Sequence, residues 1–459
     1  MEPSFQLIVD LMQDLRNSKS ASGVLVSNFS SEMKEDIRET RLENGIVALT
    51  DRMEGVRSVT LGFFFRTGAR QEPAELNGIT HFIEHCVFKG SANRSAREIA
   101  AEQDRLGGGL DAFTTHEETG FVMKVVDDQF DRAFALLAEM VTRPRFDESD
   151  LVNEQRVIIE EIKMNEDSPE DVLSDIFQRE FFPGNPLGVS IPGTAETVST
   201  FDHRRTADFF RSAFTPKELV IAAAGNVDHE HLLELVDPLY RDARWDAYDP
   251  RIAIRTPATA APVQVERRPD LEQAHLLIAT PTVSARDERR YAADMLANIL
   301  GGGTSSRLWQ RVREERGLAY SIGAATAMFI DCGFLAVSAA TSPDQIDEVA
   351  EIVADEMGSI VREGVSEDEL GLMKDQARAS ILLGLEDSAD RAGSLAHCEM
   401  VHGRQISIEE TLEKLEAVTV AKVRDIAAEF FSTDRLAVIA LGDLDGLRFS
   451  GDSLAIATS

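Results

Sequence analysis

One segment constrains this chain more than any other: residues 77–90, which read Asn-Gly-Ile-Thr-His-Phe-Ile-Glu-His-Cys-Val-Phe-Lys-Gly. Its closely spaced apolar residues predict a short buried helix. The first asparagine is expected to cap the first turn, and the last glycine to end the helix in a left-handed conformation. His81, Glu84 and His85 then project from one face, because residues three and four apart are neighbours on a helical surface.

These three ionisable groups need a partner if the helix is buried, because removing them from water alone costs several kcal/mol. A divalent metal ion removes that cost, and zinc suits two imidazoles that lie one helical turn apart. Glu84 would then lie beside a metal-bound water molecule and accept its proton. The order His-x-x-Glu-His inverts the commoner zinc motif His-Glu-x-x-His. The alternative is a pair of core histidines whose ring nitrogens bond to backbone carbonyls.

Length and composition exclude several classes of protein. The 459 residues are too many for one hydrophobic core and predict two or more domains. The formal net charge of -33 argues against a nucleic-acid partner, since no basic patch would neutralise phosphates. This charge suits a basic peptide substrate, or it is simply a solvated acidic surface. No apolar run is long enough to span a bilayer, so no membrane partner is expected. The three cysteines form no disulfide framework, which predicts a reducing, cytoplasmic compartment.

The distribution of strand and turn signals sets the predicted domain boundaries. Residues 1–36 show no clear pattern and are interpreted as a loosely attached N-terminal extension. A catalytic domain is predicted over residues 37–244, and it begins with a hairpin at Asn44-Gly45. Residues 245–262 are rich in Pro, Asp, Ala and Thr and are interpreted as a linker. A second domain is predicted over residues 263–459.

The second half of the chain repeats the first half in weak but ordered form. Gly120-Phe121-Val122 is echoed by Gly333-Phe334-Leu335, and a predicted helix over 148–165 is echoed over 367–383. We therefore predict an α+β fold of two homologous domains, each with a mostly antiparallel sheet and helices packed on one face. The helix over 289–300, which corresponds to the histidine helix, lacks the motif. Only the first domain is expected to hold a metal ion.

Two further pairs of residues are candidates for the same site. Glu154 and Glu161 lie two turns apart on one predicted helix and share a face. Alone they are solvent-facing charges, but beside a two-histidine site Glu161 becomes the natural third ligand. Arg313 and Tyr320 surround a Gly-Leu-Ala segment. Without other evidence, this second pair is a surface arginine and a core tyrosine.

Together these residues resemble the pitrilysin-type zinc metallopeptidases, the inverted zincins, which include insulin-degrading enzymes and mitochondrial processing peptidases. The chain is most similar to bacterial single-chain, processing-peptidase-like members, over roughly residues 37–450. The resemblance implies one zinc ion per chain with three ligands, namely His81, His85 and Glu161. It also implies four residues that act on the reaction, namely the base Glu84, the supporting acid Glu154, and the substrate-contacting Arg313 and Tyr320.

The resemblance also implies an activity and a mode of substrate binding. A zinc-dependent endopeptidase is expected, which cleaves short or unfolded peptides in a chamber that the two domains enclose. The peptide would add as a strand along residues 110–114, where Asp111 replaces the asparagine usual in the family. A homodimer, or a heterodimer with a related inactive chain, is expected. The alternatives are a non-catalytic relative that acts as a binding or assembly subunit, and a metal hydrolase of small molecules.

Overall fold

The hairpin predicted at Asn44-Gly45 joins the first two strands of a six-stranded sheet. Gly45 has a φ of +99°, which favours glycine and closes the turn. In spatial order the strands are β1 (Ile37–Arg41), β2 (Val47–Arg52), β6 (Leu219–Gly225), β3 (Ser58–Phe65), β5 (Thr119–Val126) and β4 (Leu110–Thr114). Only β2 and β6 pair in parallel within this sheet, so it is mostly antiparallel, as predicted.

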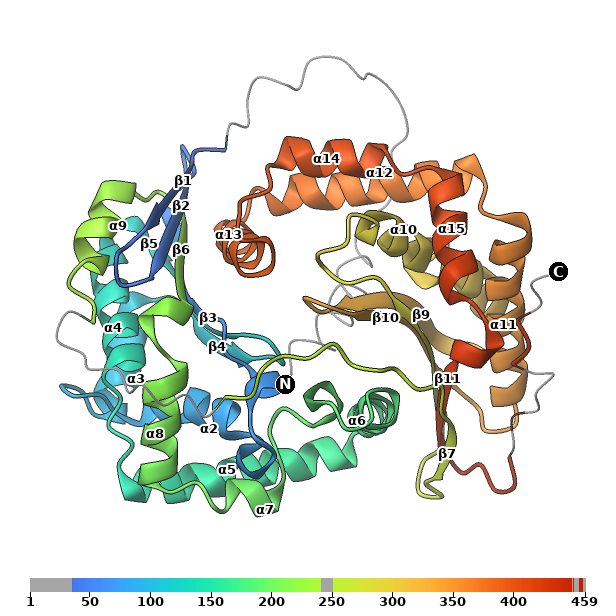
Figure 1. Ribbon diagram of the computed structural model, residues 1–459, viewed down its shortest axis with the longest axis horizontal. Coiled ribbons are helices and arrows are strands. Elements are labelled where there is room, and N and C mark those ends of the chain that lie inside the picture. The colour runs from blue at the N-terminus through green and yellow to red at the C-terminus, as the bar shows by residue number, and fades with distance from the viewer. Residues whose placement is uncertain (1–34, 241–250, 448, 450–453, 457–459) are drawn as a thin grey trace. The chain divides into compact units, whose positions relative to one another are not determined.

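The computed structural model describes residues 35–240, 251–447, 449 and 454–456 (Figure 1). The predicted N-terminal extension lies outside the described residues except for its last two, Glu35 and Asp36. Of the predicted linker, residues 251–262 are described, and they form neither helix nor strand. None of the described helices is both long enough and apolar enough to cross a bilayer.

One face of the first sheet packs against most of the helices of its unit. Leu61, Phe63 and Phe65 of β3 all point to that face, because alternate residues of a strand share a face, and all three are fully buried. The helices on this face are α2 (Ile79–Cys86), α3 (Ala96–Leu106), α4 (Phe130–Thr142), α5 (Glu148–Asp167), α7 (Ala195–Val198), α8 (His203–Ala213) and α9 (His229–Val236).

A second sheet has five strands, whose order repeats that of every strand of the first sheet except β1, which confirms the predicted internal repeat. Its strands in spatial order are β7 (Val263–Arg267), β11 (Ala437–Gly442), β8 (Ala274–Thr282), β10 (Gly333–Thr341) and β9 (Ala319–Met328). The pair β7 and β11 is parallel, like β2 and β6 of the first sheet, and the other pairs are antiparallel.

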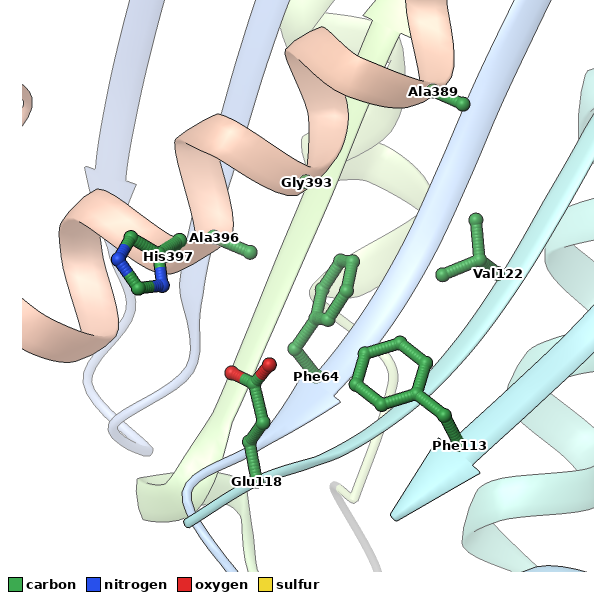
Figure 2. Close-up of a pocket in the computed structure, with 8 residues that line it drawn as sticks. All are labelled: Phe64, Phe113, Glu118, Val122, Ala389, Gly393, Ala396 and His397. Carbon is green, nitrogen blue, oxygen red and sulfur yellow. The ribbon is translucent and has the colours of Figure 1, made fainter. Parts of the chain in front are cut away.

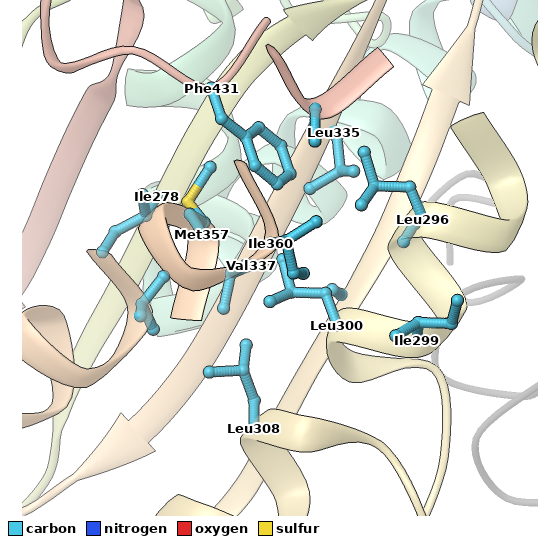
Figure 3. Packing of buried hydrophobic residues seen from close by; sticks show 14 of the residues in the cluster. Ile278, Leu296, Ile299, Leu300, Leu308, Leu335, Val337, Met357, Ile360 and Phe431 are labelled. Carbon is cyan, nitrogen blue, oxygen red and sulfur yellow. The ribbon is translucent and has the colours of Figure 1, made fainter. Parts of the chain in front are cut away.

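The core of the second unit lies between this sheet and its own helices. These are α10 (Arg290–Gly301), α11 (Ile346–Glu363), α12 (Glu367–Gly384), α14 (Ile408–Glu416) and α15 (Val420–Phe430). Figure 3 shows Ile278 of β8 and Val337 of β10 in one cluster with Leu296 and Leu300 of α10. Burying an aliphatic side chain of this size contributes about 1.5–3 kcal/mol. As predicted, α10 takes the place of the histidine helix and carries no histidine.

Two helices belong to a different unit from the one that their sequence position predicts. The first compact unit comprises the described residues of 1–162, 190–254 and 382–407, and the second those of 163–189, 255–381 and 408–459. The second unit therefore contains α6 (Pro169–Phe181), and the first contains α13 (Ser388–His402). The units thus differ from the continuous domains predicted over 37–244 and 263–459 by these two exchanged segments.

The exchange has a physical cause, because both sheets are apolar on both faces. In β8, Ile278 faces the core helices, whereas Leu277 and Ala279 face the opposite side, where they pack with Phe177 and Phe181 of α6. In the first unit, α13 covers the corresponding face of β2, β3 and β6. The sequence predicts helices on only one face of each sheet. In the structure, one further helix covers the other face of each sheet.

A buried ion pair holds α13 on the first sheet. The side chain of Glu399 on α13 is only 1% exposed. Its two carboxylate oxygens accept hydrogen bonds from Nη2 of Arg41 at 2.6 Å and from Nη2 of Arg66 at 2.8 Å. Two partly exposed arginines share this carboxylate, so its removal takes the buried partner from both, although Arg41 keeps Glu39 at 2.8 Å.

We predict that Glu399→Ala lowers the free energy of unfolding by about 1–3 kcal/mol, since it breaks a buried charged pair of which one side remains hydrated. Urea titration followed by circular dichroism measures the change. The matched control is Glu409→Ala, which removes an exposed carboxylate at the start of α14 and should leave the transition in place. Equal midpoints for the two variants would show that this pair does not hold α13.

Candidate metal centre

The helix with the His-x-x-Glu-His motif is present as α2, but it is not capped as predicted. Asn77 does not cap it, because its Nδ2 donates hydrogen bonds to Oε2 of Glu72 at 3.2 Å and to the carbonyl of Ser190 at 3.0 Å. The capping position is held by Gly78, whose φ of +93° brings the chain into the helix. The residue that satisfies the open N–H groups of the helix must therefore come from elsewhere.

Glu72 supplies that cap from the segment before the helix. Its Oε2 accepts a hydrogen bond from the backbone N–H of Gly78 at 2.7 Å, and its Oε1 accepts one from that of Thr80 at 2.8 Å. Glu72 is 3% exposed; burial raises its pKa to about 7, and the bonds from Thr80 and Gly78 oppose that rise. A carboxyl group here also lies at the positive end of the helix dipole. Sequence reasoning missed this residue.

The segment before Glu72 is in turn bonded to the turn that follows β4. The backbone N–H of Arg70 donates to the carbonyl of His116 at 2.8 Å, and the guanidinium of Arg70 pairs with Glu117 at 2.6 Å. Gly68 allows this approach, because a Cβ there would lie 2.5 Å from the backbone of His116. These bonds fix the start of α2 relative to the end of β4.

The end of α2 departs from the prediction in a smaller way. A 3₁₀ turn over Val87–Lys89 continues the helix, and the chain leaves it at Gly90 with a φ of +148°. This positive φ favours glycine, but it lies outside the left-handed helical region that the sequence predicts. Cys86 is 2% exposed, as expected for a core residue.

The predicted metal ligands lie together in the first unit. On α2, the rings of His81 and His85 have centroids 4.7 Å apart. Oε1 of Glu161, on α5, lies 3.7 Å from Nε2 of His81, and its Oε2 lies 3.6 Å from Nε2 of His85. One ligand atom from each of the three residues lies within 4.8 Å of the others, and the described part of the chain contains no other group of this kind.

The spacing of these atoms fits a divalent metal ion. A distance of 3.6 Å or more is too long for a hydrogen bond, so direct bonding does not explain why the three groups face one another. A tetrahedral zinc ion with bonds of about 2.0–2.1 Å places its ligand atoms about 3.3–3.5 Å apart. Two imidazole nitrogens and one carboxylate oxygen are a donor set that zinc uses in proteins.

The two histidines differ in their protonation. Burial lowers the pKa of His81 to about 3, and nearby His85 adds to this effect. The buried Nδ1 of His81 has no hydrogen-bond partner among the described residues. For His85, burial lowers the pKa, but the hydrogen bond with Glu154 and the charges of Glu84 and Glu161 raise it above its ordinary value. His81 is therefore neutral near pH 7 and ready to bind a metal, whereas at His85 a proton competes with a metal more strongly than at an ordinary histidine.

Glu84 is held by the edge strand of the sheet. It is 8% exposed, and its Oε2 accepts a hydrogen bond of 2.7 Å from Oγ1 of Thr114, the last residue of β4. Burial raises the pKa of Glu84, and the bond from Thr114 opposes that rise. A carboxyl group whose pKa is raised in this way is suited to accepting and returning a proton. Sequence reasoning did not anticipate the role of Thr114.

Glu154 lies on the far side of His85 from the ligand set. Its Oε2 is 3.4 Å from Nδ1 of His85, and its Oε1 is 2.9 Å from Nζ of Lys89. Burial raises the pKa of Glu154, but His85 and Lys89 outweigh burial, so the pKa falls below its ordinary value. A carboxylate on the second nitrogen of an imidazole fixes the orientation of the ring. The structure thus brings the predicted supporting acid next to His85, and adds Lys89.

Arg313 and Tyr320 lie beside one another in the second unit. The guanidinium carbon of Arg313 is 4.9 Å from the centroid of the Tyr320 ring and 4.1 Å from that of Trp309. Tyr320 is 66% exposed at the start of β9, so it is not a core tyrosine. Stacking on two aromatic rings limits the movement of the guanidinium. The action of this pair on a substrate stays a prediction.

A motif helix of this type on one half of a repeated α+β fold is typical of inverted-zincin metallopeptidases. Residues 47–195 match the family model described as Insulinase (Peptidase family M16), and residues 200–377 match the one described as Peptidase M16 inactive domain. The chain belongs to the insulinase family of peptidases, M16.

Curated relatives and solved structures agree with this assignment. The chain is 37% identical to an uncharacterized zinc protease of Streptomyces coelicolor, over 86% of this chain and 87% of the relative. It is 33% identical to one of Bacillus subtilis, over 87% of this chain and 96% of the relative. A solved protease from Helicobacter pylori has a TM-score of 0.82 at 21% identity, over 89% of this chain and 99% of that chain, which shows the shared fold.

We predict that Glu72→Ala weakens Zn²⁺ binding by about tenfold, because the start of α2 loses two hydrogen bonds and its ligands are less firmly oriented. The same change should lower the free energy of unfolding by about 1–3 kcal/mol, since two buried N–H groups lose their acceptor. Competition with a chromophoric chelator measures the affinity. Glu75→Ala removes an exposed neighbour as the control. Unchanged Zn²⁺ affinity in Glu72→Ala would refute the positioning role.

Proposed function

We propose that this chain is a zinc-dependent endopeptidase that cleaves short or unfolded peptides, with Glu84 as the general base. The observation that carries the proposal is the convergence of His81, His85 and Glu161 within 4.8 Å of one another, beside Glu84 on the same helix. Membership of a peptidase family, with relatives named zinc proteases, supports the same chemistry.

The ion would be held by the two imidazoles and the carboxylate of Glu161. When bound, zinc supplies Lewis acidity, which acidifies a water molecule and polarises the scissile carbonyl. Glu154 would keep the ring of His85 in its binding orientation through the 3.4 Å contact with Nδ1. Lys89 balances the charge of Glu154 at 2.9 Å.

Glu84 would move the proton. Its Oε2 is fixed by Thr114, whereas its Oε1 accepts no hydrogen bond from the described residues and is available to the attacking water. Glu84 would take a proton from that water and pass it to the leaving amine. Burial raises the pKa of Glu84, which favours the protonated form that would serve as the acid in the second step.

The peptide would bind beside β4. This strand is the last in its sheet and pairs only with β5 among the described strands. An extended peptide added to its open edge gains main-chain hydrogen bonds, which give binding that tolerates many sequences. Because β4 ends at Thr114, which bonds to Glu84, a peptide on this edge would pass close to the general base.

Arg313 and Tyr320 are proposed to act on the substrate from the second unit. The exposed hydroxyl group of Tyr320 can donate to a developing oxyanion, and the stacked guanidinium of Arg313 can steady the peptide or the same oxyanion. We also propose that the protein is located in the cytoplasm. It would pair there with a second copy of itself or with a related inactive chain.

We predict that Glu84→Gln keeps one zinc ion per chain but lowers kcat/KM for a quenched peptide by about 10²–10⁴-fold, because the amide cannot accept a proton. Metal analysis of the purified variant and a fluorescence assay measure the two quantities. Full activity in this variant would show that Glu84 is not the base. A wild-type protein that binds zinc but cleaves no member of a peptide library would instead favour the non-catalytic binding or assembly role.

We predict that Glu161→Gln weakens zinc binding by about a hundredfold or more, since it removes a charged ligand. Activity should fall in parallel and should return on addition of excess Zn²⁺; treatment of the wild-type protein with a chelator should have the same effect. The control is Glu166→Gln, which changes an exposed residue of the same helix. If the two variants bind zinc equally well, Glu161 is not a ligand.

A further inference from the structure

A pocket of about 210 Å³ lies on the face of the first sheet opposite α2, beneath α13 (Figure 2). Phe64 of β3, Phe113 of β4 and Val122 of β5 form its floor, and Gly393 and Ala396 of α13 form its roof. These five residues offer only apolar surface and backbone. The pocket is therefore shaped for a hydrocarbon group.

Two titratable side chains break this apolar lining, Glu118 and, from α13, His397. Glu118, in the turn between β4 and β5, directs its carboxyl group toward Phe64 and the pocket (Figure 2). Among the described residues this carboxyl group has no hydrogen bond or ion pair, and the eight residues that line the pocket include no lysine or arginine. The neighbouring Glu117 forms an ion pair with Arg70 at 2.6 Å, so that arginine is already engaged.

The isolation of Glu118 has an energetic consequence. Burial, together with the charge of Glu117, raises the pKa of Glu118 to about 7. A carboxylate that is removed from water and given no counter-charge destabilises its ionised form. A bound cation would restore the ionised form and form a charge-assisted hydrogen bond with it. The missing partner is thus a positive charge carried on an apolar stem.

We propose that this pocket binds the side chain of a lysine or arginine residue of the peptide substrate, with Glu118 as its counter-charge. The proposal rests on the proposed peptidase function. The methylene stem of such a side chain lies well against aromatic rings, and its cationic end gains from contact with their faces. Phe113 and Phe64, with ring centroids 6.4 Å apart, offer those surfaces on the way to Glu118.

The strand geometry places this pocket within reach of a peptide on β4. Thr114 and Ala112 point to the side of α2, where Thr114 bonds to Glu84 and Ala112 packs against the core. Phe113 lies between them and points to the pocket. A peptide paired with β4 also directs alternate side chains to the two faces of the sheet. The lysine or arginine of the peptide would therefore point to the face of the sheet that carries the pocket. The peptide residues directly before and after it would point to the opposite face, where α2 and the metal ligands lie.

A positional-scanning library of quenched peptides tests the proposal. The wild-type protein should prefer Lys or Arg over Gln at one position by about tenfold or more, as expected for a charge-assisted bond in a partly dry site. Glu118→Gln should abolish that preference and leave the other positions unchanged. Glu118→Lys should reverse it toward Asp and Glu. The control Glu43→Gln, an exposed residue of the β1–β2 turn, should keep the wild-type profile.

The failure of this proposal can be separated from the failure of the enzyme assignment. If the wild-type protein cleaves peptides and Glu118→Gln shows the same profile, the pocket proposal is wrong and the peptidase stands. If no peptide is cleaved, the peptidase proposal fails, and binding to the Glu84→Gln protein decides the pocket. Fluorescence anisotropy should then show about tenfold tighter binding of an Arg peptide than of its Gln counterpart, a difference lost in Glu84→Gln/Glu118→Gln. Equal affinities would overturn the proposal.

Discussion

The cost of burying charge governs the layout of the first unit. α2 places His81, Glu84 and His85 on one face of a largely buried helix, and each of these groups needs compensation within reach. Glu161 and Glu154, on α5, lie on either side of His85, and Thr114, at the end of β4, bonds to Glu84. The long helix α5 and the edge strand β4 must therefore both pack against α2, each from its own side. The candidate metal site follows from this arrangement, because two imidazoles and a carboxylate face one another without being hydrogen-bonded.

The rigidity of the site comes from residues that touch neither metal nor substrate. Glu72 caps α2 with two hydrogen bonds to backbone N–H groups, although it is separated from the helix by a 3₁₀ turn. The bonds of Arg70 to His116 and Glu117 join the same segment to the turn after β4. The helix of the proposed ligands is thus tied twice to the C-terminal end of β4, through Arg70 in the segment before α2 and through Glu84 within α2. Such support would keep the proposed ligands in place with or without an ion.

Periodicity and spacing predict much of this arrangement from the sequence, and the exceptions have a common cause. The hairpin at Asn44-Gly45 begins the first sheet where the sequence predicts it, and the seven-residue spacing of Glu154 and Glu161 places both carboxylates near the histidines. The exchange of α6 and α13 was not predictable, because an apolar stripe shows that a face will be buried and not which sheet will cover it. Glu72 and Glu118 were missed for a related reason. Glu72 caps α2 because the chain folds back to bring it there, which no local pattern shows. Glu118 stands out because none of the described residues near its carboxyl group pairs with it, which only the structure reveals.

The internal repeat shows which part of the site belongs to the fold itself. In the second unit, α10 corresponds to α2 and β9 to β4, and Asp294 of α10 accepts a hydrogen bond from Thr326 of β9. Burial raises the pKa of Asp294 to about 6. Like Glu84 and Thr114, this pair joins a helix to an edge strand. However, Thr326 stands two residues before Met328, which takes the place of Thr114 beside the turn, and α10 has no histidine. A bond between a buried carboxyl group and an edge-strand threonine therefore occurs in both halves, and by itself it indicates no catalysis. In the first half alone, two imidazoles lie on the same helix as that carboxyl group, which is why we propose a reaction only there.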